Sequence, residues 1–174
     1  MGKIYTSKVC VVGDTTVGKT SLLLKYSKNT FIENYKPTLG ADFVIKEEKL
    51  DDEDQFHLYL WDLAGNPSFA ILRQYYMHGA NGAIVCFDLG NSTTFESVPN
   101  WLKDVYRIRP QKIPVILVGT KADTEQVVTD EEIETFCAEN DNIPFMKTSS
   151  KDGTNVREVF QEIIRMIMER TQTE

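Results

Sequence analysis

The sequence predicts an α/β fold in which a mostly parallel sheet of six strands, one of them antiparallel, carries five helices on its two faces. Short apolar segments alternate with longer amphipathic ones along the whole chain. The apolar segments are nearly continuous, as in strands that are buried on both faces. The last amphipathic segment spaces its apolar residues by three and four, as a helix does. No repeat or linker divides the 174 residues, so we expect one domain over residues 1–174.

The predicted elements follow one another in a regular order. We expect helices to begin at Thr93 and Thr129, because each has a glutamate three residues later, which is the capping-box spacing. The acidic stretch 50–54 indicates a turn between two antiparallel strands. Strands are expected near residues 7–13, 41–50, 55–62, 82–88, 113–120 and 143–147, and helices near 18–28, 68–78, 93–108, 129–139 and 154–170.

The most informative segment is residues 13–20, G-D-T-T-V-G-K-T, which matches the phosphate-binding pattern G-x-x-x-x-G-K-[ST]. An apolar strand precedes it and a helix follows it, so backbone N–H groups and the helix N-terminus point at one anion. Lys19 adds a positive charge, and the Thr20 hydroxyl can hold Mg²⁺. This combination predicts the fold of the P-loop nucleoside triphosphatases.

Four further segments each lie beside the end of a predicted strand. Thr38, in the loop before the second strand, could reach Mg²⁺, although a loop threonine alone is a weak signal. Asp62 ends a strand and can hold a metal through water. Asp123 can accept two hydrogen bonds from N1 and N2 of guanine, a donor pair that adenine lacks. A backbone N–H in 148–151 could bond guanine O6. Ligands of such folds bind beyond the carboxyl ends of the strands, so these segments should converge on one edge.

In order and spacing, the five motifs resemble those of the Ras-superfamily small GTPases over nearly the whole chain. The resemblance implies a molecular switch that binds GTP or GDP with Mg²⁺ and slowly hydrolyses GTP to GDP and phosphate. It implies that Thr20 and Thr38 ligate Mg²⁺, that Asp62 supports the metal through water, and that the Gly65 N–H contacts the γ-phosphate. Catalytic roles fall to Asn66, Lys19, Thr38 and Gly65. The implied nucleotide contacts are Asp14, Thr15, Thr16, Val17, Gly18, Lys19, Thr20, Ser21, Phe31, Tyr35, Thr38, Gly65, Thr120, Lys121, Asp123, Ser149, Ser150 and Lys151.

The resemblance is to Rab and Ras proteins without a firm subfamily. The run T-L-G-A-D-F at 38–43 is similar to Rab proteins, whereas L-R-Q-Y-Y-M at 72–77 is closer to Ras. Phe43, Trp61 and Tyr76 fall where Rab proteins have an exposed aromatic trio that contacts effectors. Simple packing between a loop and the sheet explains the same three residues equally well.

Two departures from the family pattern bear on hydrolysis. Asn66 stands where the family has the glutamine that orients the attacking water, and its carboxamide is drawn back by one methylene. Pro67 follows and stiffens that loop. No arginine precedes Arg73. Arg73 is a conceivable source of the charge-stabilising arginine, but we expect it to be a solvated charge on a helix, so a partner would have to supply that arginine.

These departures leave alternatives open. A hydrolysis-impaired, constitutively GTP-bound interaction module is the main alternative, because Asn66 and Pro67 replace the catalytic glutamine segment. An adenine-nucleotide kinase or ATPase would share only the phosphate loop, and Asp123 argues against it.

Composition limits the partners. A formal net charge of −7 argues against broad binding to nucleic acid or anionic lipid. Three cysteines without paired spacing indicate a reducing compartment. We expect a cytoplasmic monomer without a membrane anchor of its own, peripheral to membranes only if a lipidated tail belongs to a longer parent chain. Effectors, exchange factors and activating proteins would bind the switch loops 31–43 and 63–78.

Overall fold

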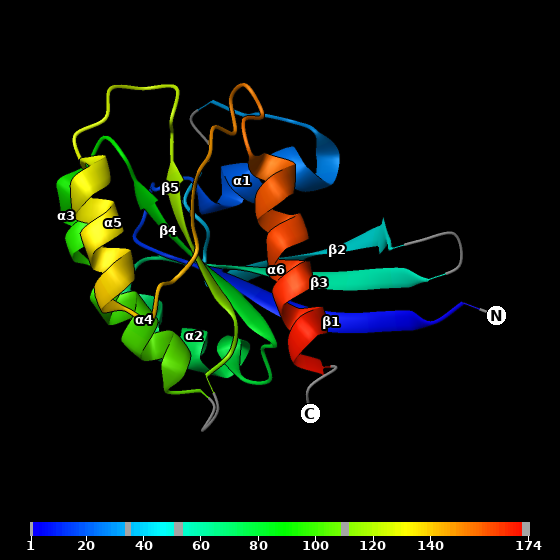
Figure 1. Cartoon of the computed structure of the whole chain (residues 1–174). Coiled ribbons are helices and arrows are strands. Elements are labelled where there is room, and N and C mark those ends of the chain that lie inside the picture. Colours follow the sequence, from blue (N-terminus) through cyan, green and yellow to red (C-terminus); the bar gives the residue numbers. More distant parts are fainter. Residues whose placement is uncertain (1, 34–35, 51–53, 109–111, 172–174) are drawn as a thin grey trace.

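The computed structural model describes residues 2–33, 36–50, 54–108 and 112–171, and its centre is a six-stranded sheet (Figure 1). The strand order is β2-β3-β1-β4-β5-β6. β2 and β3 pair antiparallel, and all the other pairs are parallel, as the sequence predicts. The turn expected between β2 and β3 lies outside the described residues at 51–53. The strands are β1 (Ile4–Val12), β2 (Ala41–Lys49), β3 (Gln55–Leu63), β4 (Gly82–Asp88), β5 (Val115–Thr120) and β6 (Phe145–Lys147).

Helices cover both faces of this sheet (Figure 1). α1 and α6 pack on one face, and α2, α4 and α5 on the other, with α3 beside β4. No helix in the described part of the chain is long and apolar enough to cross a membrane. The helices are α1 (Lys19–Lys28), α2 (Ala70–Met77), α3 (Ser92–Glu96), α4 (Val98–Tyr106), α5 (Asp130–Glu139) and α6 (Val156–Thr171), and a 3₁₀ turn, η1 (Pro67–Phe69), precedes α2.

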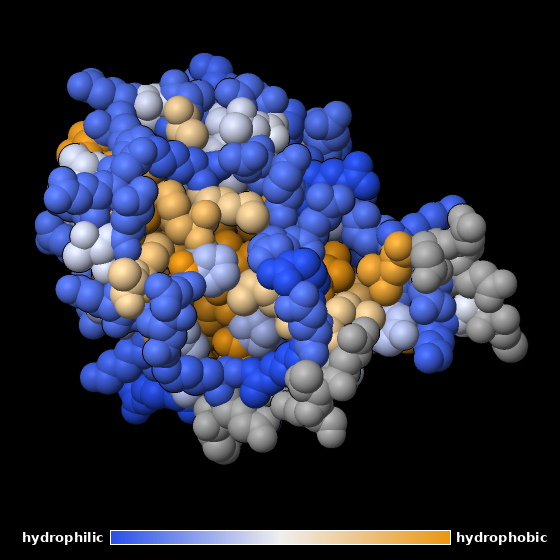
Figure 2. All heavy atoms as spheres, in the orientation of Figure 1, coloured by the Kyte–Doolittle hydropathy of each residue, from blue (hydrophilic) through white to orange (hydrophobic). Residues whose placement is uncertain are grey.

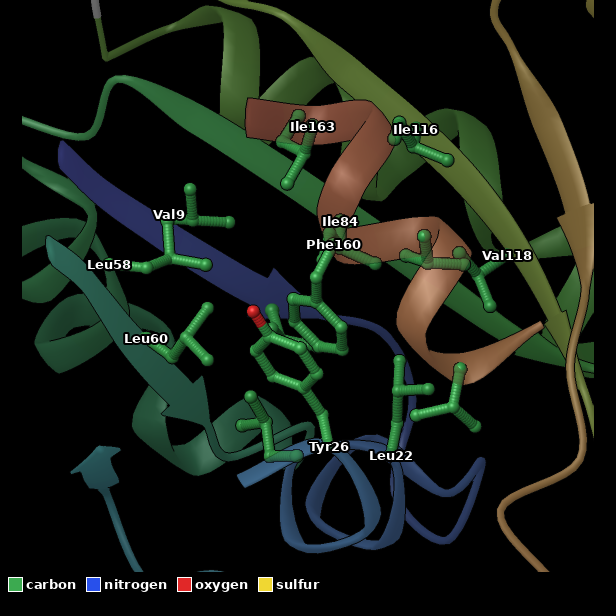
Figure 3. Close-up of a cluster of buried hydrophobic side chains, with 14 of the residues drawn as sticks. Val9, Leu22, Tyr26, Leu58, Leu60, Ile84, Ile116, Val118, Phe160 and Ile163 are labelled. Carbon is green, nitrogen blue, oxygen red and sulfur yellow. The ribbon is translucent and has the colours of Figure 1, made fainter. Parts of the chain in front are cut away.

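The central strand β1 contributes to two hydrophobic cores because successive side chains of a strand point to opposite faces. Val9 faces α1 and α6, whereas Cys10 faces the other helices. In the first core, the rings of Tyr26 and Phe160 stack with centroids 3.8 Å apart, so α1 is held against α6 (Figure 3). In the orientation of Figure 2 the outer surface is mainly hydrophilic, and hydrophobic side chains gather between α5 and α6.

One expected helix is wrong in detail. The helix predicted over 93–108 is two helices, α3 and α4, which meet at Ser97. Pro99 explains the break, because it cannot donate the backbone hydrogen bond that a continuous helix needs there. The expected cap at Thr93 is also wrong, since Asn91 caps α3 by accepting from the Thr93 N–H at 3.1 Å. At Thr129 the predicted capping box with Glu132 is present.

Candidate nucleotide-binding site

A cavity of about 770 Å³ lies at the edge where β1, β3 and β5 end, and it brings together all the segments that the sequence nominated. Such a volume is typical of sites for small molecules and cofactors. The convergence predicted from the strand ends is therefore what the structure shows. The cavity is lined by Thr15, Thr16, Gly18, Lys19, Thr20, Ser21, Phe31, Ile32, Glu33, Lys36, Pro37, Thr38, Leu39, Gly65, Asn66, Phe69, Thr120, Lys121, Asp123, Thr124, Ser150 and Lys151.

The phosphate loop runs from β1 to α1 with a backbone that few side chains tolerate. Gly13 has a φ of 144°, and a Cβ there would lie 2.2 Å from the carbonyl oxygen of Cys86. Thr16 has a φ of 64°, which is unusual for a β-branched residue and typical of functional loops. α1 has no side-chain cap at Gly18. Its first N–H groups are therefore available to an anion in the cavity.

Lys19 places a cation at the base of this loop. Its side chain is buried, and Nζ donates to the carbonyl oxygen of Asp14 at 2.7 Å. Burial lowers the pKa of Lys19, and the nearby Asp62 carboxylate opposes that change. A buried ammonium group with a carbonyl and one carboxylate nearby is electrostatically suited to receive phosphate oxygens.

Three oxygen-bearing side chains meet beside Lys19. The hydroxyls of Thr20 and Thr38 are 2.9 Å apart, and both donate to Oδ2 of Asp62, Thr38 at 3.1 Å. The second oxygen, Oδ1, is buried without a hydrogen-bond partner in the described part of the chain. Burial raises the pKa of Asp62, while the Thr20 hydroxyl and the Lys19 charge lower it.

This set fits Mg²⁺. A hard cation takes hydroxyl and carboxylate oxygens, and Mg²⁺ is typically held by one or two carboxylates together with substrate phosphates. The unpartnered carboxylate oxygen of Asp62 is a polar group that needs a partner. Among the described residues no group of three His, Cys, Asp or Glu side chains could hold a metal. A metal here would thus rely on the Asp62 carboxylate, the two threonine hydroxyls and the phosphates of a bound ligand.

The opposite end of the cavity is organised around Asp123. Ser149 donates its hydroxyl to Asp123 Oδ1 at 2.7 Å, which fixes the carboxylate. Lys121 has a left-handed backbone with a φ of 59° and pairs with Asp88 at 2.7 Å. The Thr120 hydroxyl contacts the carbonyl oxygen of Val17 and so links this motif directly to the phosphate loop. The two ends of the cavity are therefore connected by a direct hydrogen bond.

The segment after β3 carries the departures noted in the sequence. The side-chain oxygen of Asn66 accepts the Ser68 N–H at 2.9 Å and caps η1, so this oxygen is occupied locally. η1 begins at Pro67, and the helix expected over 68–78 is this turn followed by α2. The expectation of a solvated Arg73 is wrong: the side chain is 5% exposed and donates to the carbonyl oxygens of Ala64 and Asn66.

Not every nominated residue lines the cavity. Asp14, Val17, Asp62 and Ser149 stand behind the lining and hold residues that do reach it. Tyr35 lies outside the described residues. Sequence reasoning did not name several lining residues as nucleotide contacts, because no pattern assigns them that role and only the path of their loops brings them to the cavity. The missed residues are Ile32, Glu33, Lys36, Pro37, Leu39, Phe69 and Thr124.

The aromatic trio forms a continuous stack next to the site. The ring of Trp61 lies 5.3 Å, centroid to centroid, from both Phe43 and Tyr76. Phe43 is 52% exposed, and Lys8 Nζ lies 4.7 Å from the Trp61 ring. The three rings thus pack against one another, as simple packing predicts, and Phe43 also presents an exposed aromatic surface.

The fold and this site define the class of P-loop nucleotide-binding proteins. The Ras family model matches residues 8–169. The Ras-related protein RABG3f of Arabidopsis thaliana is 37% identical over 167 residues, which cover 91% of this chain and 80% of the relative. The GTP-binding protein ypt1 of Schizosaccharomyces pombe is 35% identical, with coverage of 95% and 82%. The Ypt/Rab-type GTPase ypt7 of the same yeast is 35% identical, with coverage of 96% and 84%. The chain therefore belongs to the Ras family of small GTPases and is Rab-like.

Proposed function

We propose that this protein is a guanine-nucleotide-dependent switch, formed by a single domain over residues 1–174, which binds GTP or GDP with Mg²⁺. The observation that carries the proposal is the meeting of Thr20, Thr38 and Asp62 beside Lys19, at one end of the cavity that Asp123 lines at its other end. A phosphate site, a site suited to Mg²⁺ and a base site in one cavity support a nucleoside triphosphate as ligand.

The phosphates would lie against the loop of residues 13–20. Lys19 would contact the β- and γ-phosphates, and the N–H groups at the start of α1 would add further hydrogen bonds. Thr20, Thr38 and Asp62 would hold Mg²⁺, which when bound neutralises phosphate charge that builds up during transfer. The Gly65 N–H would reach only the γ-phosphate, so the switch loops would respond to its presence.

Asp123 supports guanine as the base. Its carboxylate can accept hydrogen bonds from N1 and N2, and Ser149 already holds it in one orientation. Adenine lacks that donor pair, so an adenine nucleotide would leave a charged acceptor unsatisfied. Phe31 would pack against the base, Lys121 would lie along it, and residues 149–151 would close it in.

Slow hydrolysis follows from the segment after β3. The Asn66 oxygen is occupied by Ser68, and Asn66 is shorter than the family glutamine. This observation favours a second candidate function, a hydrolysis-impaired module that stays bound to GTP. Displacements of about 1 Å can cost on the order of 10² in a reaction that depends on positioning.

Regulation would come from partners that bind the loops 31–43 and 63–78. Arg73 is buried and engaged with backbone carbonyls, and no arginine precedes it in the chain. An activating protein would therefore supply the arginine, which in related GTPases is worth about 10³–10⁵ in rate. Effectors would contact the aromatic trio of Phe43, Trp61 and Tyr76. We further propose a cytoplasmic monomer.

The experiment is single-turnover hydrolysis of Mg²⁺–GTP by the purified protein, compared with Asn66→Ala and Asn66→Gln. GDP that accumulates over hours in the wild type would support the switch, whereas persistent GTP would support the hydrolysis-impaired module. We expect Asn66→Ala to leave the rate unchanged, because the side-chain oxygen is used as a cap. Asn66→Gln, with its longer reach, should raise the rate by up to about 10²-fold. A slower Asn66→Ala variant would show that Asn66 already orients water.

A further inference from the structure

Arg73, Trp101 and Asp14 form a connected set that joins three elements. The guanidinium carbon of Arg73, in α2, lies 4.6 Å from the centre of the Trp101 ring in α4. The indole N–H of Trp101 donates to Oδ1 of Asp14, in the phosphate loop, at 2.7 Å. Arg73 and Trp101 are 5% and 6% exposed. The Asp14 carboxylate fixes the orientation of the Trp101 ring, and the buried Arg73 cation lies on the face of that ring.

The set acts on the backbone beside the γ-phosphate position. Nη1 of Arg73 donates to the carbonyl oxygens of Ala64 and Asn66, at 2.9 and 2.7 Å. These two carbonyls flank Gly65. On its other side Gly65 packs against the phosphate loop, because a Cβ there would lie 2.4 Å from backbone atoms of Asp14 and Thr15. Residues 64–66 are thus held between Arg73 and the phosphate loop.

Burying this guanidinium group carries a cost. Desolvation by burial lowers the pKa of Arg73, although Asp104 and Asp14 oppose that change, and Nε is buried without a partner among the described residues. A side chain needed only for packing would avoid that cost with an apolar residue. What the charge provides here is two charge-assisted bonds to one loop segment.

We propose that Arg73 is a positioning residue, which holds residues 64–66 so that the Gly65 N–H is already in place for a γ-phosphate. The Trp101 ring supports the Arg73 guanidinium group, and the Asp14 carboxylate fixes the Trp101 ring. The inference rests on the proposed guanine-nucleotide function. Without the two hydrogen bonds from Arg73, GTP would have to order residues 64–66 as it binds, and fixing backbone torsions costs free energy. GDP has no γ-phosphate and would not meet that cost.

The test measures the affinities of the purified protein and its variants for GDP and for a non-hydrolysable GTP analogue, both with Mg²⁺. Arg73→Gln should weaken analogue binding by roughly tenfold or more and change GDP binding little, since bonds to a charged donor are lost. Arg73→Lys should restore part of the loss. Trp101→Phe keeps an aromatic face but removes the N–H to Asp14, so we expect a smaller loss in the same direction. The control is Arg165→Gln on α6, which removes a surface arginine that pairs with Glu162 and Glu169.

A second readout is the fluorescence emission of Trp101. In a Trp61→Phe background, Trp101 is the remaining tryptophan, so its emission should differ between the GDP and analogue states, and Arg73→Gln should reduce that difference. Equal loss of GDP and analogue binding, or an unchanged affinity ratio in folded Arg73→Gln, would overturn the positioning role. Wild-type protein that bound neither nucleotide would instead overturn the proposed function, so the two failures are distinguishable.

Discussion

Two buried ionisable side chains of opposite charge define the site at the residue scale. The pKa of Lys19 is lowered and that of Asp62 is raised, in both cases chiefly because burial disfavours the charged form. The lowered pKa of Lys19 disfavours the positive charge that would bind phosphate, and the raised pKa of Asp62 disfavours the negative charge that would bind Mg²⁺. A bound nucleotide with its metal would reverse that balance by supplying partners for both charges. Burying these two charges therefore costs the fold stability, which is a common consequence of preorganised sites.

The base-reading role of Asp123 gives the first prediction at this scale. Asp123→Asn should lower GTP affinity by about 10²-fold or more, because an amide cannot accept from both N1 and N2 of guanine. The same variant should gain affinity for xanthosine triphosphate, whose C2 oxygen replaces the amino group. Competition binding between the two nucleotides measures the change. Ser149→Ala is the matched control, since it frees Asp123 without altering its chemistry and should weaken GTP binding without favouring xanthine.

An unchanged preference for guanine in Asp123→Asn would remove Asp123 from base recognition. A switch of preference in Ser149→Ala would instead assign the reading of the base to the serine.

At the scale of elements, helix starts depend on side chains that accept backbone N–H groups. Thr129→Ala should lower the free energy of unfolding by about 1 kcal/mol, because it removes the capping box of α5. Asn91→Ala should have a similar effect on α3, where its side chain is the observed cap. Thr93→Ala should change stability little, because its hydroxyl does not cap that helix. Denaturant unfolding of the three variants measures these differences.

A loss at Thr93 as large as that at Asn91 would contradict the observed cap. The sequence pattern favours Thr93 as the cap of α3, whereas the geometry favours Asn91.

The elements also show what a sequence can predict here. The phosphate loop was predictable because its motif and both flanking elements are local in the chain. Asn91 was missed because two neighbouring residues could each cap the same helix, and only backbone torsions decide between them. The burial of Arg73 could not be predicted, because it depends on Trp101, which is distant in the sequence. Likewise, residues 64–66 lie between Arg73 and the phosphate loop only because of tertiary packing.

At the scale of the whole molecule, the strand order explains why distant motifs share one cavity. β1 lies between β3 and β4, and β5 follows β4, so the parallel strands present their carboxyl ends at one edge. Thr120 reaches from β5 to the phosphate loop, and Asp62 reaches Thr20 from β3. A ligand in this cavity would therefore contact segments from most of the sheet. Its binding should stabilise the fold as a whole.

That expectation gives a prediction for thermal unfolding of the nucleotide-free protein. A ligand present at about 100 times its dissociation constant adds about 2.7 kcal/mol of stability. For a chain of this size each kcal/mol raises the Tm by about 2–4 °C, so Mg²⁺–GTP and Mg²⁺–GDP should each raise it by roughly 5–10 °C. Mg²⁺–ATP should have little effect, because Asp123 would be left unsatisfied. Chelation of Mg²⁺ should reduce the GTP effect, since Thr20, Thr38 and Asp62 would lose the ion that joins them to the phosphates.

Lys19→Ala is the control for this experiment, because it leaves the cavity in place but removes the cation at its base. GTP should no longer raise the Tm of that variant, because the cation that would receive the phosphate oxygens is gone. An equal rise with ATP and GTP would favour the adenine-nucleotide alternative. A full rise in Lys19→Ala would show that the nucleotide binds elsewhere than in the phosphate loop, and the cavity assignment would then be wrong.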